Sequence, residues 1–213
     1  MKSFLVLGIG RFGESLAKTL FKNGYEVMVI DTDEKRVQEI SPFVTHAIIG
    51  DCTDEDVLKS IGMRNFDVAI VSVGGDLQSS IVSTLILKEA GVKEVLVKAQ
   101  GELHAKVLKK IGADKIILPE RDMGMRVAHL LTTKHFLDLI ELSPNYSIVE
   151  IMVPEKWVGR KLGEIDVRKK YNINVVAVKN NGNHVEMAPS ASLVFNTDDI
   201  LVVIGNSEAI DKI

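Results

Sequence analysis

The sequence predicts an α/β protein in which a doubly wound parallel sheet is followed by a small α+β module. Short apolar runs alternate with helix-like stretches over residues 1–140, which favours a parallel sheet. A small or charged residue stands where each apolar run stops, and such positions line the edge of a parallel sheet outside which ligands bind. After Ser143-Pro144-Asn145 the runs alternate or become β-branched. We therefore expect a first domain over residues 1–140, including a long crossover helix, and a second over residues 141–213.

Each apolar run of the first domain is expected to be a strand, because each is followed by turn or helix residues. These runs are Val6-Leu7, Val27 to Ile30, Ala47 to Ile49, Val68 to Val71, Val95 to Val97 and Ile116 to Leu118. After Gly10, apolar residues recur at helical spacing, and Asp31 or Asp33 is expected to begin the next helix. Further helices are expected over residues 53–61, 104–111 and 120–131, the last continuing weakly through Phe136 to Leu139. Another helix is expected to begin after Asp76 as N-cap, to carry apolar residues from Leu77 to Ile86 and to stop at Gly91.

The second domain is expected to be rich in strands. Residues 147–153 alternate or run apolar and stop at Pro154. The β-branched run 173–178 leads into residues 180–183, Asn-Asn-Gly-Asn, which are typical of a hairpin turn. A further strand is expected over residues 200–204, with Asn206 as the cap of a short last helix.

The composition excludes several classes of protein. Among the 213 residues, Lys and Arg total 26 and Asp and Glu total 29, so a net charge of −3 argues against a nucleic-acid or anionic-membrane binder. Cys52 is the single cysteine, which allows no internal disulfide and fits a reducing compartment. No apolar run approaches the ~20 residues that span a bilayer, and Met1 to Phe4 carry no secretory signal, so a cytoplasmic location is expected.

Gly8, Gly10 and Gly13 form a G-x-G-x-x-G motif between an expected strand and an expected helix, which is the context of a Rossmann-like nucleotide site. Phosphate would lie at the helix N-terminus, where free N–H groups and the dipole favour an anion. Asp31 stands 18 positions after Gly13 at the end of the second strand. A carboxylate there accepts hydrogen bonds from ribose hydroxyls and repels a 2′-phosphate, which favours NAD or an adenosine nucleotide over NADP. The alternative is a structural glycine turn with Asp31 as a helix N-cap.

Four further residues lie at this edge of the expected sheet. Arg11 and Lys98 each have two interpretations, and Asp51 and Cys52 are expected near the adenine. Arg11 opposes the helix dipole, so it is either a solvated surface group or a contact to phosphate, here or on a neighbouring subunit. Lys98 either reaches phosphate or is a solvated charge. Asp51 and Cys52 end the third strand near the expected adenine, and Cys52 is expected to be a packing residue and not a reactive thiol.

The residues argue against a dehydrogenase. A hydride-transfer enzyme needs an acid/base group near the nicotinamide and a substrate pocket. No Tyr-x-x-x-Lys is present, and the five histidines show no metal-ligand spacing. The second domain is too small to enclose a substrate, so binding the nucleotide is expected to be the function of the site.

Several short segments resemble the RCK (KTN) gating-ring proteins, and more closely the cytosolic regulatory subunits of Ktr-type potassium uptake systems. The segments of the first domain are Ile9 to Gly13, Val29 to Asp31, Asp51 to Asp54, Val97 to Gln100, Ile111 to Asp114 and Pro119 to Gly124. Those of the second are Leu162 to Arg168, Tyr171 to Val175, Pro189 and Asp199 to Gly205. The resemblance covers nearly the whole chain and implies a TrkA-N domain followed by a TrkA-C domain, the C-terminal RCK module.

The resemblance implies a regulatory function and not an enzymatic one. Members of this family form homodimers that assemble into an octameric ring under a membrane potassium channel subunit, which would make the chain peripheral at the inner face of the membrane. ATP favours the active ring and ADP the inactive one, and NAD(H) binding also occurs in the family. The alternatives are an NAD(H)-dependent redox sensor or small oxidoreductase, and a regulatory subunit for another membrane partner.

The resemblance also implies which residues bind ligands. Arg11 would reach the ATP γ-phosphate across the dimer, and Glu120 would act in nucleotide or divalent-cation binding. The nucleotide set is Gly8, Gly10, Arg11, Phe12, Gly13, Asp31, Thr32, Asp33, Asp51, Cys52, Val73, Gly74, Gly75, Lys98, Ala99, Gln100, His104 and Glu120. A second ligand, inhibitory cyclic di-AMP, would bind at the dimer interface of the C-terminal module through Ile165, Asp166, Arg168, Ile173, Asn174 and Pro189.

Overall fold

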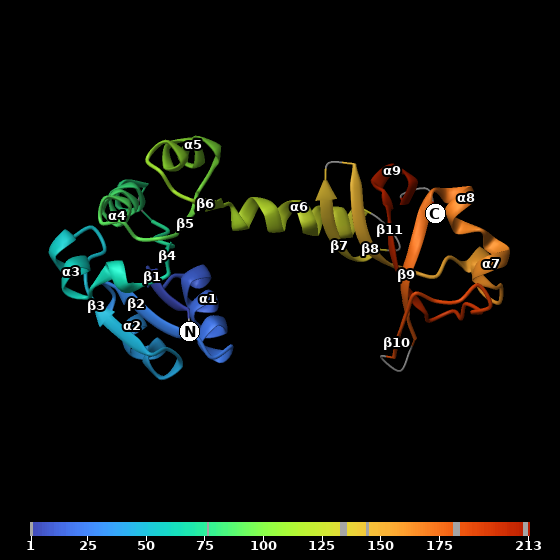
Figure 1. The fold of residues 1–213 in the computed structure, drawn as a ribbon, viewed down its shortest axis with the longest axis horizontal. Helices are drawn as coiled ribbons and strands as arrows, with labels where there is room; N and C mark the ends of the chain where they lie inside the picture. The colour runs from blue at the N-terminus through green and yellow to red at the C-terminus, as the bar shows by residue number, and fades with distance from the viewer. Residues whose placement is uncertain (1, 76, 133–135, 144, 181–183, 211–212) are drawn as a thin grey trace. The chain divides into compact units, whose positions relative to one another are not determined.

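The computed structural model describes residues 2–75, 77–132, 136–143, 145–180, 184–210 and 213. The chain divides into two compact units, Met1–Glu120 and Arg121–Ile213. Each unit has its own sheet and its own hydrophobic core (Figure 1). None of the helices in the described ranges is both long enough and apolar enough to cross a membrane.

The N-terminal unit is a parallel sheet with the strand order β3-β2-β1-β4-β5-β6, as predicted for a doubly wound fold. Its strands are β1 (Ser3–Leu7), β2 (Glu26–Asp31), β3 (His46–Ile49), β4 (Val68–Val71), β5 (Val95–Lys98) and β6 (Lys115–Ile117). Its helices are α1 (Arg11–Lys22), α2 (Glu34–Ile40), α3 (Glu55–Ser60), α4 (Leu77–Glu89), α5 (Glu102–Lys110) and the beginning of α6 (Pro119–Thr132), with short 3-10 turns at Ser41–Phe43 and Met63–Asn65. Because the order reverses between β1 and β4, the connections diverge there and leave a crevice at the carboxyl ends of the strands.

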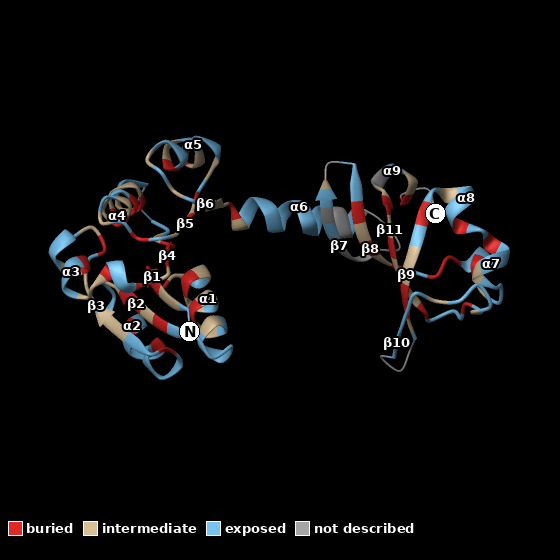
Figure 2. Ribbon diagram, in the orientation of Figure 1, coloured by how far each residue is buried: buried red, intermediate tan, exposed pale blue. Residues whose placement is uncertain are grey.

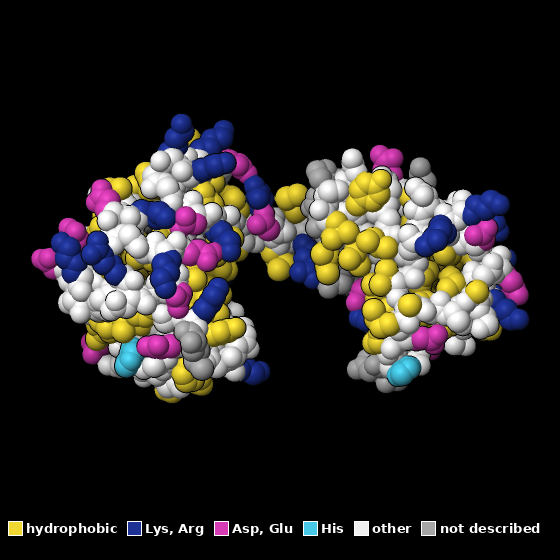
Figure 3. Space-filling view, viewed as in Figure 1, with side chains coloured by type: hydrophobic (Ala, Val, Ile, Leu, Met, Phe, Trp, Pro, Cys, Tyr) yellow, Lys and Arg dark blue, Asp and Glu magenta, His cyan; other side chains and the backbone are white. Residues whose placement is uncertain are grey.

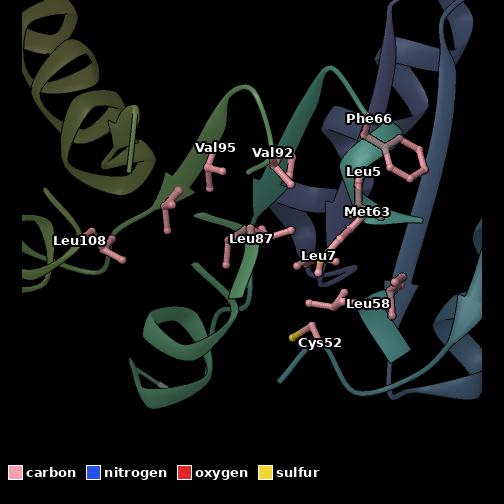
Figure 4. Packing of buried hydrophobic residues seen from close by; sticks show 14 of the residues in the cluster. Leu5, Leu7, Cys52, Leu58, Met63, Phe66, Leu87, Val92, Val95 and Leu108 are labelled. Atoms are coloured by element: carbon pink, nitrogen blue, oxygen red, sulfur yellow. The ribbon is translucent and has the colours of Figure 1, made fainter. Parts of the chain in front are cut away.

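Alternate side chains of each central strand point into two separate cores. Leu5 and Leu7 of β1 belong to one cluster with Leu58 of α3, Leu87 of α4 and Leu108 of α5 (Figure 4). The intervening Val6 belongs to the other cluster, with residues of α1 and α2. This alternation follows from the two-residue period of a strand and explains why the runs read as continuously apolar. Figure 2 shows the buried residues concentrated on the central strands.

Side-chain caps show where two of the predicted helices begin. Asp33 caps α2 by accepting a 3.2 Å hydrogen bond from the backbone N–H of Arg36. Asp54 caps α3 by accepting from Asp56 and Val57 at 2.9 and 3.3 Å. The predicted cap Asp76 lies outside the described residues. Asp33, and not Asp31, is therefore the residue that begins α2.

The C-terminal unit contains an antiparallel sheet with the strand order β10-β9-β11-β8-β7. Its strands are β7 (Phe136–Ser143), β8 (Tyr146–Met152), β9 (Ile173–Lys179), β10 (Val185–Met187) and β11 (Ile200–Asn206). Its helical turns are Glu155–Trp157, α7 (Leu162–Ile165), α8 (Val167–Tyr171) and α9 (Ser207–Ile210). The expected α+β module is confirmed, and most of the predicted hairpin turn at residues 180–183 lies outside the described residues.

One sequence prediction in this region is wrong. Residues Phe136 to Leu139 were expected to continue the helix, but they begin strand β7. This strand pairs with β8, with Ile140 opposite Ile148. The pairing is between segments on either side of a turn, so a backbone ladder outweighs a weak helical pattern here.

Trp157 is the centre of the C-terminal core. It is fully buried and lies between Tyr171 and Phe195, with ring centroids 5.3 and 6.2 Å away. Strand residues such as Ile151 and Leu201 complete the cluster. Strands β7 and β8 also carry exposed apolar side chains, namely Ile140, Leu142, Tyr146 and Met152. Figure 3 shows exposed hydrophobic side chains on this unit in yellow.

Replacement of Trp157 should destabilise the C-terminal unit selectively. We expect Trp157→Ala to lower its free energy of unfolding by about 3–5 kcal/mol, because a large buried ring leaves a cavity. Hydrogen exchange followed by mass spectrometry should show faster exchange in peptides of residues 147–206 than in those of residues 3–118. Met187→Ala, at a side chain that is exposed, is the matched control. Equal acceleration in both units would contradict the independence of the two cores.

Candidate functional site

A cavity of about 430 Å³ lies at the carboxyl ends of β1, β2 and β4 in the N-terminal unit. This is the place where the strand order reverses and where open α/β sheets bind ligands. Six predicted site residues line it: Gly8, Gly10, Asp31, Val73, Gly74 and Gly75. Three more lining residues were missed by the sequence reasoning: Arg36, Ser72 and Ser79.

The three glycines of the motif differ in backbone angle and in the space that a side chain would find there. Gly8 has a φ of +92°, and a Cβ there would lie 2.9 Å from the backbone N of Val73. A Cβ on Gly13 would lie 2.1 Å from the carbonyl oxygen of Gly8 and 2.4 Å from the hydroxyl of Ser72. Gly10 has an ordinary φ of −76° and open space around it. Gly8 and Gly13 are therefore fixed by packing, whereas Gly10 keeps open the approach to the N-terminus of α1.

Asp31 is tied to the glycine loop. Its carboxylate accepts the backbone N–H of Ile9 at 2.5 Å and that of Asp33 at 2.9 Å. A carboxylate has about four lone-pair directions, so it keeps the capacity to accept further donors from the cavity. Asp33, and not Asp31, caps α2, so Asp31 does not act as the helix cap of the alternative interpretation, and its role toward ribose stays a prediction. Thr32 between them is exposed, and Asp33 also pairs with the guanidinium of Arg36, with Nε and Oδ2 3.2 Å apart.

Ser72 supports the loop from the neighbouring strand. Its side chain is buried. Its hydroxyl proton is shared between the carbonyl oxygens of Gly8 and Leu7, which lie 2.6 and 3.1 Å from Oγ. A signal was present in the sequence, since Ser72 directly follows the fourth apolar run. Phe12 of the motif points the other way and packs against the core on the α1 side of the sheet.

A group of charges lies at the end of β5 and the start of α6. Lys98 pairs with Glu120, with Nζ and Oε1 2.6 Å apart. The hydrogen bond from Lys98, with help from the backbone of Glu120 and the charge of Arg11, lowers the pKa of the Glu120 carboxyl. Two cations against one carboxylate leave an excess of positive charge that suits an anion.

These charges do not form a metal centre on their own. Among the described residues no group of three or more His, Cys, Asp or Glu side chains is placed to hold a metal ion. Glu120 is a single carboxylate already paired with Lys98. Mg²⁺ is commonly held by one or two carboxylates together with phosphate oxygens, so a cation at Glu120 would depend on a bound nucleotide for its other ligands.

Gln100 and His104 are not among the residues that line the cavity, but Gln100 contacts a residue that does. Gln100 donates from its side-chain Nε2 to the carbonyl oxygen of Gly74 at 3.1 Å. His104 is 4% exposed and accepts the backbone N–H of Gln100 at Nδ1, 3.2 Å away. Burial lowers the pKa of His104. Ala99 is buried in the core of the sheet.

Asp51 and Cys52 are not among the residues that line the cavity. Asp51 accepts hydrogen bonds from the backbone N–H and the hydroxyl of Thr53 at 2.8 and 2.7 Å, which lowers its pKa. Cys52 is buried in the core, and burial raises the pKa of its thiol. The prediction that Cys52 is a packing residue agrees with this burial.

The second predicted site divides into buried and exposed residues. Ile165 and Ile173 are buried in the core of the C-terminal unit. Arg168 and Asn174 are exposed and in contact, with the Arg168 Nε donating to the Asn174 Oδ1 at 2.7 Å. Asp166, at a φ of +53°, is exposed beside them in sequence, and Pro189 is half-buried.

Comparison with known proteins gives a match along both units. The TrkA-N domain family matches residues 4–119 and the TrkA-C domain family residues 147–213. The Ktr system potassium uptake protein C of Bacillus subtilis (strain 168) is 49% identical over 211 residues, covering 99% of this chain and 95% of that protein. The Ktr system potassium uptake protein A of the same organism is 40% identical over 211 residues, with the same coverage.

Solved structures share the fold. The GsuK channel superposes with a TM-score of 0.71 at 18% sequence identity, covering 98% of this chain and 38% of the channel chain. The GsuK channel bound to NAD gives a TM-score of 0.67, also at 18% identity, with 98% and 38% coverage. At this identity the likeness concerns the fold of the chain.

Gly10 and Gly13, the second and third glycines of the motif, should respond differently to replacement by alanine. We expect Gly13→Ala to lower the free energy of unfolding by about 1–3 kcal/mol, because its Cβ would overlap the Gly8 carbonyl and the Ser72 hydroxyl. Gly10→Ala should change it by less than about 1 kcal/mol, because the backbone angle is ordinary and the space is open. Urea denaturation of both variants measures the difference, and equal losses would contradict the assignment of the close contact to Gly13.

Proposed function

Because the chain belongs to the family of proteins with a TrkA-N domain followed by a TrkA-C domain, and within it to the Ktr system potassium uptake proteins, we propose that it is the nucleotide-binding regulatory subunit of a potassium uptake system. The observation that carries the proposal is the cavity at the point where the strand order reverses, bounded by Gly8, Gly10 and Asp31. The curated relatives are matched over 95% of their length, so the proposed role extends to the whole chain.

The ligand of the N-terminal unit is an adenine nucleotide in this proposal. Phosphate lies at the N-terminus of α1, where Gly10 leaves room and the helix dipole favours an anion. Asp31 accepts the ribose hydroxyls with the lone pairs that Ile9 and Asp33 leave free. Lys98, which is paired with Glu120, favours a further phosphate, with a divalent cation entering as part of the nucleotide complex.

ATP activates and ADP inactivates in the proposed mechanism. The two nucleotides differ by one charged phosphoryl group, and a ligand shifts an equilibrium only through contacts that differ between two states. Arg11 stands at the first position of α1, exposed and free to reach the γ-phosphate of a nucleotide on a neighbouring subunit. A homodimer within an octameric ring would bring such subunits together, and the ring would act on a membrane potassium channel subunit from the cytoplasmic side.

The C-terminal unit is proposed to bind cyclic di-AMP as an inhibitory ligand. The contact between Arg168 and Asn174 offers a guanidinium and an amide on the exposed side of α8 and β9, groups that suit phosphate and adenine. Ile165 and Ile173 would act by shaping the core beneath.

A second candidate is an NAD(H)-dependent redox sensor or small oxidoreductase. Asp31 at the end of β2 supports it, because dinucleotide-binding folds place the ribose carboxylate there. GsuK, whose fold this chain shares, has been solved as a channel bound to NAD. Hydride exchange with a partner molecule would favour this candidate over the regulatory one.

The first test is the ligand dependence of stability and mass. We expect ATP and ADP to raise the melting temperature of an octamer-sized particle, measured by scanning fluorimetry and light scattering, with a separate shift from cyclic di-AMP. Gly10→Ala should fold normally and weaken ADP binding by about tenfold or more, because its methyl occupies the phosphate approach. A shift with NADH alone in a dimer-sized particle would replace the proposal by the redox candidate.

Arg11 should separate ATP from ADP. We expect Arg11→Ala to retain ADP affinity and lose about 10- to 100-fold in ATP affinity, because a charge-assisted hydrogen bond contributes about 1.5–3 kcal/mol. Titration calorimetry with both nucleotides measures this. Arg36→Ala is the control, since Arg36 lines the cavity beside Asp33 and should affect both nucleotides alike. Unchanged discrimination in Arg11→Ala would show that another group reads the γ-phosphate.

A further inference from the structure

His104 is a buried polar residue that contacts the binding site only through another residue. Its imidazole is 4% exposed and is absent from the cavity lining. Its Nδ1 accepts the backbone N–H of Gln100 at 3.2 Å. Within the described part of the chain, its Nε2 has no hydrogen-bond partner.

The hydrogen bond defines the form of the imidazole. A nitrogen that accepts a hydrogen bond carries no proton, so Nδ1 is unprotonated and the neutral ring carries its proton on Nε2. A buried donor without a partner destabilises the fold, so an apolar side chain would serve packing alone better. What a histidine provides at this position, and an apolar residue would not, is an acceptor for the backbone N–H of Gln100.

Gln100 transmits this restraint to the cavity. Its side-chain Nε2 donates to the carbonyl oxygen of Gly74 at 3.1 Å, and Gly74 and Gly75 line the cavity. A Cβ built on either glycine would meet no atom within 4 Å, so packing does little to hold this segment. Two glycines also leave the backbone freer than other residues would. The contact from Gln100 is therefore a side-chain restraint on the Gly74 part of this wall.

We infer that His104 is a positioning residue for the nucleotide site: its neutral imidazole holds the backbone of Gln100, and Gln100 holds the Gly74 carbonyl at the cavity wall. This inference rests on the proposed nucleotide binding and names a residue that controls it without touching the ligand. Protonation of Nδ1 would place two N–H groups against each other and would break the connection.

Among the described residues, no carboxylate forms an ion pair with the His104 imidazole, and burial is the cause of its lowered pKa. Three lysines on neighbouring elements are paired elsewhere: Lys98 of β5 with Glu120, Lys88 of α4 with Asp114, and Lys115 of β6 with Glu94. Glu89 ends α4 at the opposite end of the helix from its start at Leu77. On α5 itself the charged side chains are exposed, namely Glu102, Lys106, Lys109 and Lys110.

The sign of the pH effect follows. The pKa of His104 is lower in the folded protein than in the unfolded chain, whose value is about 6.5. The stability that depends on neutral His104 is therefore complete above about pH 6.5 and is lost as the pH falls through the lowered pKa. Nucleotide binding should weaken as the pH falls through the lowered pKa of His104 in the folded protein.

The test compares substitutions that remove or retain the acceptor. His104→Leu removes it, and His104→Asn places an amide oxygen near the position of Nδ1. We expect His104→Leu and Gln100→Leu each to weaken ADP binding at pH 7.5 by about 5- to 10-fold, and the double variant to be no weaker than either, since the two residues act in series. His104→Asn should bind ADP within about twofold of wild type and lose the weakening that wild type shows as the pH is lowered below about 6.5.

Hydrogen exchange of the ligand-free variants separates positioning from folding. Peptides containing residues 73–75 should exchange faster in His104→Leu and Gln100→Leu than in wild type and His104→Asn. The N–H of Gln100 should also exchange faster in His104→Leu, which removes its acceptor, and peptides distant from these two segments should be unchanged. His46→Asn, at an exposed histidine of β3, is the control and should keep the wild-type pH dependence. Wild-type ADP affinity in His104→Leu, or additive losses in the double variant, would overturn this inference alone. Absence of any nucleotide binding in the wild-type protein would overturn the proposed function together with it.

Discussion

The approach of Gly13 to the carbonyl of Gly8 and the hydroxyl of Ser72 determines how the N-terminal unit is built around its cavity. Because Gly13 has no Cβ, α1 can begin directly beside the ends of β1 and β4. The N-terminus of α1 then faces the cavity, and its unpaired N–H groups are available to an anion. Asp31 fixes the same loop from β2 through the N–H of Ile9. A loop of three glycines is therefore held in one conformation by a neighbouring hydroxyl and a neighbouring carboxylate.

The charges around this loop divide into two groups with different partners. Asp31 accepts backbone N–H groups, whereas Glu120 is paired with Lys98 and lies within the influence of Arg11. In the proposed function the first group accepts ribose hydroxyls and the second receives phosphate, which is the division that a nucleotide, with a sugar and phosphates, would require.

The sequence predicted the sheet, the glycine loop and the place of the cavity, because spacing along the chain reflects short-range geometry. It left open whether Asp31 or Asp33 begins α2, and the side-chain contacts assign the cap to Asp33 and the loop to Asp31. Phe136 to Leu139 were mistaken for helix because the pairing that makes them a strand involves a separate segment. Arg36 and Ser79 escaped prediction because they lie on helices whose orientation toward the cavity depends on packing. His104 was expected in the pocket but lies behind it, since burial of a single side chain is a three-dimensional property.

Cys52 gives the N-terminal unit a built-in reporter. Its thiol is enclosed by the core, and its raised pKa disfavours the reactive thiolate. An alkylating reagent can therefore modify it only when this part of the sheet opens. Because the chain has one cysteine, the rate of modification counts openings of the N-terminal unit alone, without any label having to be introduced.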